Sequence, residues 1–172
     1  MRVLGIDPGT RHLGYGLVED RQGDFFAEDF GCLDFPPSLP IEQRLYQVYT
    51  HIANMIGMFS PQEVAIEQPF LGEGSRQFVG PALAVGQAQA AVLIAAAGSN
   101  IPVFRYSPAQ VKAAVADHGA ASKEQVQAMV KMALSLDDSP QALDATDALA
   151  IALCHLRQRD AQAALSRRAD PG

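Results

Sequence analysis

Short apolar segments separated by polar turns fill the first part of the chain, and this pattern predicts β-strands. The segments are Arg2–Asp7, Leu13–Glu19 and Phe25–Leu33. Because the links between them are short, we expect three consecutive antiparallel strands. From residue 41 onward the apolar residues recur every three or four positions, which predicts a helix over Ile41–Phe59.

The apolar segments Glu63–Glu67 and Pro102–Tyr106 predict a fourth and a fifth strand. A Gly-rich loop, Leu71–Ser75, and an Ala-rich helix reaching about Ala97 lie between them. Since strand four follows a crossover helix, it is expected to run parallel to strand one. This order predicts an α/β fold with a mixed five-stranded sheet and helices on its faces.

Three serines precede helical patterns in the last part of the chain and predict helix N-caps. They are Ser107, Ser122 and Ser139. The helix after Ser122 is expected to reach about Leu136, and the last helix to end near Arg159. We therefore expect one domain over residues 1–160 and a flexible tail over residues 161–172.

Composition supports a single packed domain. The chain has 172 residues, of which 48% are hydrophobic and 19% charged, which excludes long disorder. Its longest clean apolar run, Ala90–Ala97, is too short for a membrane span, and the polar start is not typical of a signal peptide. With Cys32 and Cys154 far apart, we expect two reduced thiols and a cytoplasmic protein.

Four carboxylates stand where apolar residues are expected. Asp7 and Glu67 end strands one and four, and parallel neighbouring strands bring their carboxyl ends to one edge of the sheet. Asp144 and Asp147 are three residues apart in the last helix and share one face. Like charges at that spacing destabilise a helix, so a compensating partner is expected.

Four oxygen donors without a His or Cys ligand suit Mg²⁺ or Mn²⁺. A pair of such ions can assist phosphodiester hydrolysis, so we expect two per subunit. The alternative is that each carboxylate is a solvated charge at a strand end or on a helix surface.

Four segments, in this order, resemble the RuvC-type Holliday junction resolvases over residues 1 to about 159. They are GIDPGT, AIEQPF, SPAQVKAAVADHGAASKEQV and DATDALAIAL. The resemblance implies a ribonuclease H-like fold with strand order 3-2-1-4-5 and a homodimer. It also implies paired nicking of four-way DNA junctions in recombination and repair, leaving 5′-phosphate and 3′-hydroxyl ends. The family's metal-binding and catalytic carboxylates fall on Asp7, Glu67, Asp144 and Asp147.

The resemblance also implies DNA contacts. The family's base-contacting aromatic falls on Phe70, and its two DNA-binding lysines fall on Lys112 and Lys123. Arg76 is expected to contact phosphate, on the basis of its charge only. It lies in a Gly-rich stretch, Leu71–Pro81, that departs from the family pattern. The alternatives are a Phe that caps the core and lysines that are solvated. The family further implies a branch-migration complex of RuvA and RuvB as partner, at the nucleoid.

Net charge is the main argument against a nucleic-acid partner. The formal charge is −6, but bound divalent ions would offset part of it. Two other functions remain as alternatives. One is a branched-DNA-binding module without catalysis. The other is an actin-like ATPase or sugar kinase, which would need a second phosphate loop and a second domain.

Overall fold

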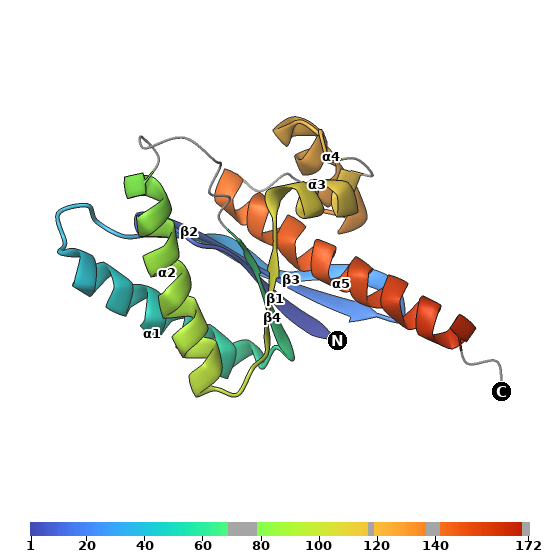
Figure 1. The fold of residues 1–172 in the computed structure, drawn as a ribbon, viewed down its shortest axis with the longest axis horizontal. Coiled ribbons are helices and arrows are strands. Elements are labelled where there is room, and N and C mark those ends of the chain that lie inside the picture. Colours follow the sequence, from blue (N-terminus) through green and yellow to red (C-terminus); the bar gives the residue numbers. More distant parts are fainter. Residues whose placement is uncertain (69–78, 117–118, 137–141, 170–172) are drawn as a thin grey trace.

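A computed structural model describes residues 1–68, 79–116, 119–136 and 142–169 (Figure 1). Five strands form one mixed sheet in the order β3-β2-β1-β4-β5, as the sequence and the family resemblance imply. The strands are β1 (Arg2–Asp7), β2 (His12–Arg21), β3 (Asp24–Asp34), β4 (Glu63–Glu67) and β5 (Val103–Tyr106). The first three pair antiparallel, whereas β4 runs parallel to β1, and β5 runs parallel to β4.

Helices cover both faces of the sheet (Figure 1). They are α1 (Ile41–Phe59), α2 (Val79–Gly98), α3 (Pro108–Ala116), α4 (Lys123–Ala133) and α5 (Leu143–Ala169). One buried cluster packs Leu4 and Ile6 of β1 against α1 and α2. The other packs Val3 of β1 and Ala65 of β4 against α3, α4 and α5. Because side chains alternate along a strand, Asp7 lies on the α5 face with Val3.

The last helix differs from its prediction. Ser139 lies outside the described residues, and the helix is described from Leu143. It continues to Ala169, so the predicted end near Arg159 is wrong, and residues 161–169 are helical. The added stretch is rich in Ala, Gln, Leu and Arg, which are good helix formers. The predicted end of α4 near Leu136 is also three residues late, since the helix ends at Ala133.

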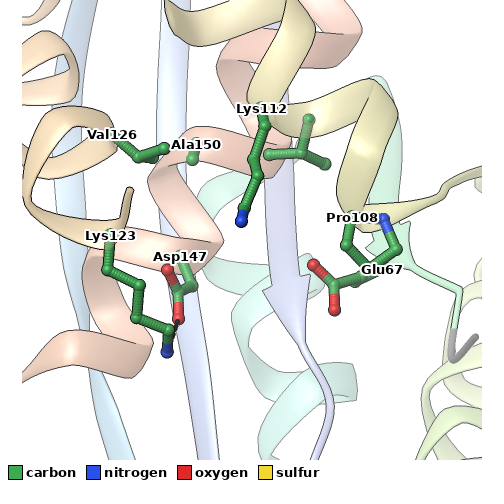
Figure 2. A pocket seen from close by; sticks show the side chains of 8 residues that line it. Glu67, Pro108, Lys112, Lys123, Val126, Asp147 and Ala150 are labelled. Carbon is green, nitrogen blue, oxygen red and sulfur yellow. Dashed lines mark ion pairs between the residues drawn. The ribbon is translucent and has the colours of Figure 1, made fainter. Parts of the chain in front are cut away.

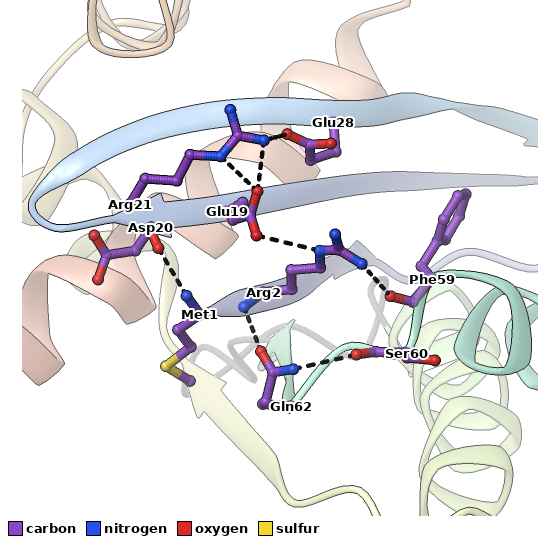
Figure 3. A network of polar contacts seen from close by, with 9 residues as sticks. All are labelled: Met1, Arg2, Glu19, Asp20, Arg21, Glu28, Phe59, Ser60 and Gln62. Carbon is purple, nitrogen blue, oxygen red and sulfur yellow. Dashed lines mark hydrogen bonds and ion pairs between the residues drawn. The ribbon is translucent and has the colours of Figure 1, made fainter.

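A network of ion pairs joins the first three strands at the end of β1 far from Asp7 (Figure 3). Arg2 Nε lies 3.4 Å from Glu19 Oε1. Arg21 Nη2 lies 2.6 Å from carboxylate oxygens of both Glu19 and Glu28. Both arginines therefore form ion pairs at the end of the sheet opposite the predicted metal ligands. Within the described residues, no helix has the length and apolar character needed to span a membrane.

Candidate functional site

Asp7, Asp144 and Asp147 lie together at the carboxyl end of β1. One carboxylate oxygen from each residue lies within 4.8 Å of those of the other two. Asp7 reaches this place because it shares the α5 face of β1, and the two α5 residues reach it because they are one helical turn apart. We call these three residues the carboxylate cluster.

Two glycines let α5 approach the sheet closely enough to form the carboxylate cluster. A Cβ atom added at Gly14 in β2 would lie 1.9 Å from the backbone oxygen of Asp144. A Cβ atom added at Gly5 in β1 would lie 2.2 Å from the backbone oxygen of Ala148. Any larger residue at these positions would displace α5, so the missing side chains help to place Asp144 and Asp147.

Glu67 lies at the same end of the sheet but outside the set of three closely spaced oxygens. Register places it there, because Ile6 of β1 pairs with Ile66 of β4. Glu67 and Asp147 line a pocket of about 240 Å³, together with Lys112 and Lys123 (Figure 2). The structure therefore gathers all four predicted carboxylates at one end of the sheet, with Glu67 on the pocket side.

Burial and mutual repulsion raise the pKa values of three of these carboxyl groups. The pKa of Asp7 rises to about 7, first because the group is buried and then because Glu67, Asp147 and Asp144 are negatively charged. Burial and the charge of Asp147 raise the pKa of Glu67. Burial also raises the pKa of Asp147, although the ammonium group of Lys123 opposes the shift. A cation placed among these groups would relieve their repulsion.

The donor set fits a hard divalent cation. Carboxylate oxygens are the only ligand atoms in the carboxylate cluster, and such ligands suit Mg²⁺, Mn²⁺ and Ca²⁺. Crowding of negative charge, which raises the pKa of Asp7, also favours the binding of a cation there.

Both predicted DNA-binding lysines border the same pocket (Figure 2). Lys112 lies in α3, where Ser107 and Gln110 exchange hydrogen bonds at the helix start. Lys123 is the first residue of α4, which begins with a capping box. Its Nζ lies 3.5 Å from Asp147 Oδ2. Their position beside the carboxylates suits contact with phosphates, and that role stays a prediction.

Phe70 and Arg76 lie outside the described residues, as does most of the Leu71–Pro81 stretch. The part that the structure describes, from Val79, belongs to α2.

Sequence reasoning missed two neighbours of Asp144. Cys32 Sγ lies 3.6 Å from Asp144 Oδ2, and His12 joins these two residues in a group whose potential ligand atoms lie within 4.8 Å of one another. Burial, followed by the charges of Asp144 and Asp34, raises the pKa of the Cys32 thiol to about 11. The feature that places Cys32 near Asp144 is the register of the β2–β3 hairpin, in which Cys32 pairs with Gly14.

A buried polar network at the amino end of β4 was also missed. His155 of α5 is 1% exposed. Its Nε2 contacts the Glu63 carboxylate, and its Nδ1 lies 2.6 Å from the Tyr106 hydroxyl group. Arg159 contacts the other oxygen of Glu63. Glu63 and Glu67 share the α5 face of β4, so one strand contributes a carboxylate to each of two separate polar sites.

Comparison with known proteins covers nearly the whole chain. Residues 3–155 match the family model described as crossover junction endodeoxyribonuclease RuvC. A protein of that name from Dehalococcoides mccartyi is 46% identical, over 92% of this chain and 93% of the relative. The solved structure of Thermus thermophilus RuvC in complex with Holliday junction substrate is 38% identical, with a TM-score of 0.85, and the match covers 92% of this chain and 94% of that one.

A more distant likeness concerns the fold alone. The yeast mitochondrial Holliday junction resolvase is 18% identical, with a TM-score of 0.66, over 92% of this chain and 79% of that one. Together these similarities confirm the ribonuclease H-like architecture that the family resemblance implies. Because the family model matches residues 3–155 and a relative is 46% identical over 92% of this chain, the chain belongs to the RuvC family of crossover junction endodeoxyribonucleases.

Proposed function

We propose that this protein is a metal-dependent endonuclease that resolves four-way DNA junctions in recombination and repair by cutting two opposed strands symmetrically. The observation that carries the proposal is the carboxylate cluster of Asp7, Asp144 and Asp147, with Glu67 beside it. Relatives that match about nine-tenths of the chain are named crossover junction endodeoxyribonucleases, and one solved relative is bound to a Holliday junction.

The proposed metal ligands are the carboxylate cluster and Glu67, which would hold two Mg²⁺ or Mn²⁺ ions in each subunit. Divalent ions bound there supply the positive charge that activates water and stabilises the leaving oxygen of a phosphodiester. Asp7 is close enough to the other three carboxylates for the charge of each to raise its pKa. Cleavage is expected to leave 5′-phosphate and 3′-hydroxyl ends.

The proposed DNA contacts surround the carboxylates. Lys112 and Lys123 would bind backbone phosphates at the rim of the pocket that Glu67 and Asp147 also line. By resemblance to the family, Phe70 would stack on bases near the crossover, and Arg76 would contact phosphate.

Two symmetric cuts require two active sites, so we propose a homodimer. Large apolar side chains are exposed on α1 and α2, including Tyr46, Met58, Leu83 and Ile94. A dimer contact would cover side chains of this kind. The family resemblance extends the proposal to transfer of the junction from RuvA and RuvB, in the cytoplasm at the nucleoid.

The test is cleavage of a synthetic mobile four-way junction, run beside linear duplex of the same sequence. Mg²⁺, Mn²⁺ and EDTA are compared. The native protein is expected to make paired nicks in the junction only, and only with metal. Asp7→Asn and Asp147→Asn should abolish nicking. Asp160→Asn is the matched control, because Asp160 is exposed on the same helix, away from the site.

Two outcomes would overturn the proposal. Junction binding without nicking under either metal would show a binding module without catalysis. Equal nicking by native protein and Asp7→Asn would show that the carboxylate cluster is not the catalytic centre.

A further inference from the structure

A second group of potential metal ligands adjoins the carboxylate cluster and shares Asp144 with it. Its members are His12 at the start of β2, Cys32 near the end of β3 and Asp144 in the first turn of α5. Their potential ligand atoms all lie within 4.8 Å of one another. The β2–β3 hairpin and the start of α5, which are far apart in the sequence, therefore meet at one place.

The distance between Cys32 and Asp144 suits a tetrahedral zinc site. Zn–S and Zn–O bonds of about 2.3 and 2.0 Å, at a tetrahedral angle, place the sulfur and oxygen atoms about 3.5 Å apart. The observed distance between Cys32 Sγ and Asp144 Oδ2 is 3.6 Å. Gly14 makes this approach possible, because it pairs with Cys32 across the hairpin and has no side chain to separate Cys32 from Asp144.

The surroundings of His12 also suit a metal ligand. Nδ1 of His12 lies 2.6 Å from Asp34 Oδ1, and a carboxylate partner that orients the imidazole is usual for zinc-binding histidines. The His12 side chain is 62% exposed, and His12 and Asp144 line a common pocket of about 520 Å³. An ion from solvent can therefore reach the group.

The two sites differ in the metal they prefer. The carboxylate cluster offers oxygen alone, which suits hard cations, whereas a thiolate with an imidazole and one carboxylate selects zinc. We propose that His12, Cys32 and Asp144 form a Zn²⁺ site that draws Asp144 away from the carboxylate cluster. On binding, the Cys32 thiol releases its proton to solvent and the sulfur bonds to the ion.

A regulatory consequence follows, and this part rests on the proposed nuclease function. Asp144 cannot serve both ions fully, so Zn²⁺ at the second site would weaken the hold of the carboxylate cluster on Mg²⁺. Zn²⁺ is then an inhibitor of junction cleavage that acts through His12 and Cys32, neither of which belongs to the proposed catalytic set.

The site itself is tested by titrating the metal-free protein with Co²⁺ and recording thiolate-to-cobalt charge-transfer absorption. The native protein should show this band, and Zn²⁺ should abolish it by displacing Co²⁺. Cys32→Ser should lack the band, and His12→Ala should require at least tenfold more Co²⁺. Cys154→Ser is the matched control and should keep it, because Cys154 is buried in the core. No band in the native protein, or a band that persists in Cys32→Ser, would overturn the site.

The inhibition is tested by titrating Zn²⁺ into the Mg²⁺-dependent cleavage assay, with each variant compared to its own zinc-free rate. Cys32→Ser and His12→Ala should need at least tenfold more Zn²⁺ than native for half inhibition. Equal inhibition of all three would place the inhibitory ion on the carboxylates alone and overturn this role. A cobalt band in a protein that cuts no junction would support the site while contradicting the proposed nuclease.

Discussion

The ammonium nitrogen of Lys123 lies 3.5 Å from Oδ2 of Asp147, so a cation from α4 lies at the edge of the carboxylate cluster of α5 and β1. This pair opposes the rise in the pKa of Asp147 that burial causes. The Lys123 side chain is 67% exposed, so water and salt screen the pair, and it contributes little to stability. Its exposed position beside the carboxylates is suited to contact with a DNA phosphate, and that contact stays a prediction.

Lys123→Ala is expected to weaken junction binding and to lower the slope of log affinity against log salt concentration by about 1, since one phosphate contact is lost. Lys131→Ala, on the same helix but away from the pocket, is the matched control and should leave the slope unchanged. The measurement is junction binding, followed by fluorescence anisotropy over a series of salt concentrations. Equal slopes for native protein and Lys123→Ala would remove this lysine from the interface.

Asp7→Asn is expected to stabilise the metal-free protein while abolishing cleavage. The folded-state pKa of Asp7 is about 7 against an ordinary 3.8. The folded state therefore holds a proton that the unfolded state releases, and this group's contribution to stability falls as pH rises from about 4 to 7. At pH 8 the variant should gain about 1 kcal/mol or more in free energy of unfolding.

Urea unfolding in EDTA at pH 5 and pH 8 measures this effect. The advantage of Asp7→Asn should be smaller at pH 5, where the native Asp7 is already protonated in the folded state. Asp160→Asn should show no such pH-dependent gain. A variant that is no more stable than the native protein at pH 8 would argue against crowding of the carboxylates.

Divalent metal ions should raise the thermal midpoint of the native protein more than that of Asp7→Asn. Binding to the folded state alone stabilises by mass action, and the native site also loses the repulsion that the ions neutralise. Scanning calorimetry with and without Mn²⁺ at pH 8 tests this expectation. Equal shifts for both proteins would mean that Asp7 does not bind the metal.

Gly14→Ala should reduce both stability and cleavage. Its Cβ would lie 1.9 Å from the Asp144 backbone oxygen, so α5 must move, at a cost of about 1–3 kcal/mol. A displacement of about 1 Å at catalytic groups can lower the rate about 100-fold. Gly57→Ala on α1 is the control, since its Cβ would meet nothing within 4 Å and alanine favours a helix. Unchanged cleavage by Gly14→Ala would contradict the proposed role of this close approach.

Tyr106→Phe should destabilise the protein by about 1–3 kcal/mol, because it leaves Nδ1 of the buried His155 without its partner. Burial lowers the pKa of His155, so the ring binds a proton less readily in the folded state than in the unfolded chain. Stability should then fall as pH drops below about 6.5, where the unfolded chain binds the proton. Unfolding followed at pH 5.5 and 7.5 measures both effects. Tyr46→Phe, at a 67% exposed position, is the control and should leave the free energy of unfolding almost unchanged.

Local sequence patterns predicted most of the elements. Glu63–Glu67 was predicted with its observed bounds, and the N-cap predicted at Ser122 is present. The end of α5 was wrong because favourable helix propensity continues past Arg159 without a breaking residue. Phe70 and Arg76 stay as predictions outside the described residues.

The sequence by itself determined the alternation that puts Asp7 and Glu67 at strand ends, and the three-residue spacing that puts Asp144 and Asp147 on one helix face. Both follow from the regular repeat of side-chain directions along a strand or a helix, which a short stretch of sequence is enough to specify. Only the tertiary structure decided that Cys32 and His12 adjoin Asp144, and that Glu63 meets His155, 92 residues away. Those contacts depend on the β2–β3 register and on how closely α5 packs against the glycines of the sheet. Register and packing distance are set by many residues at once, so no single motif reveals them.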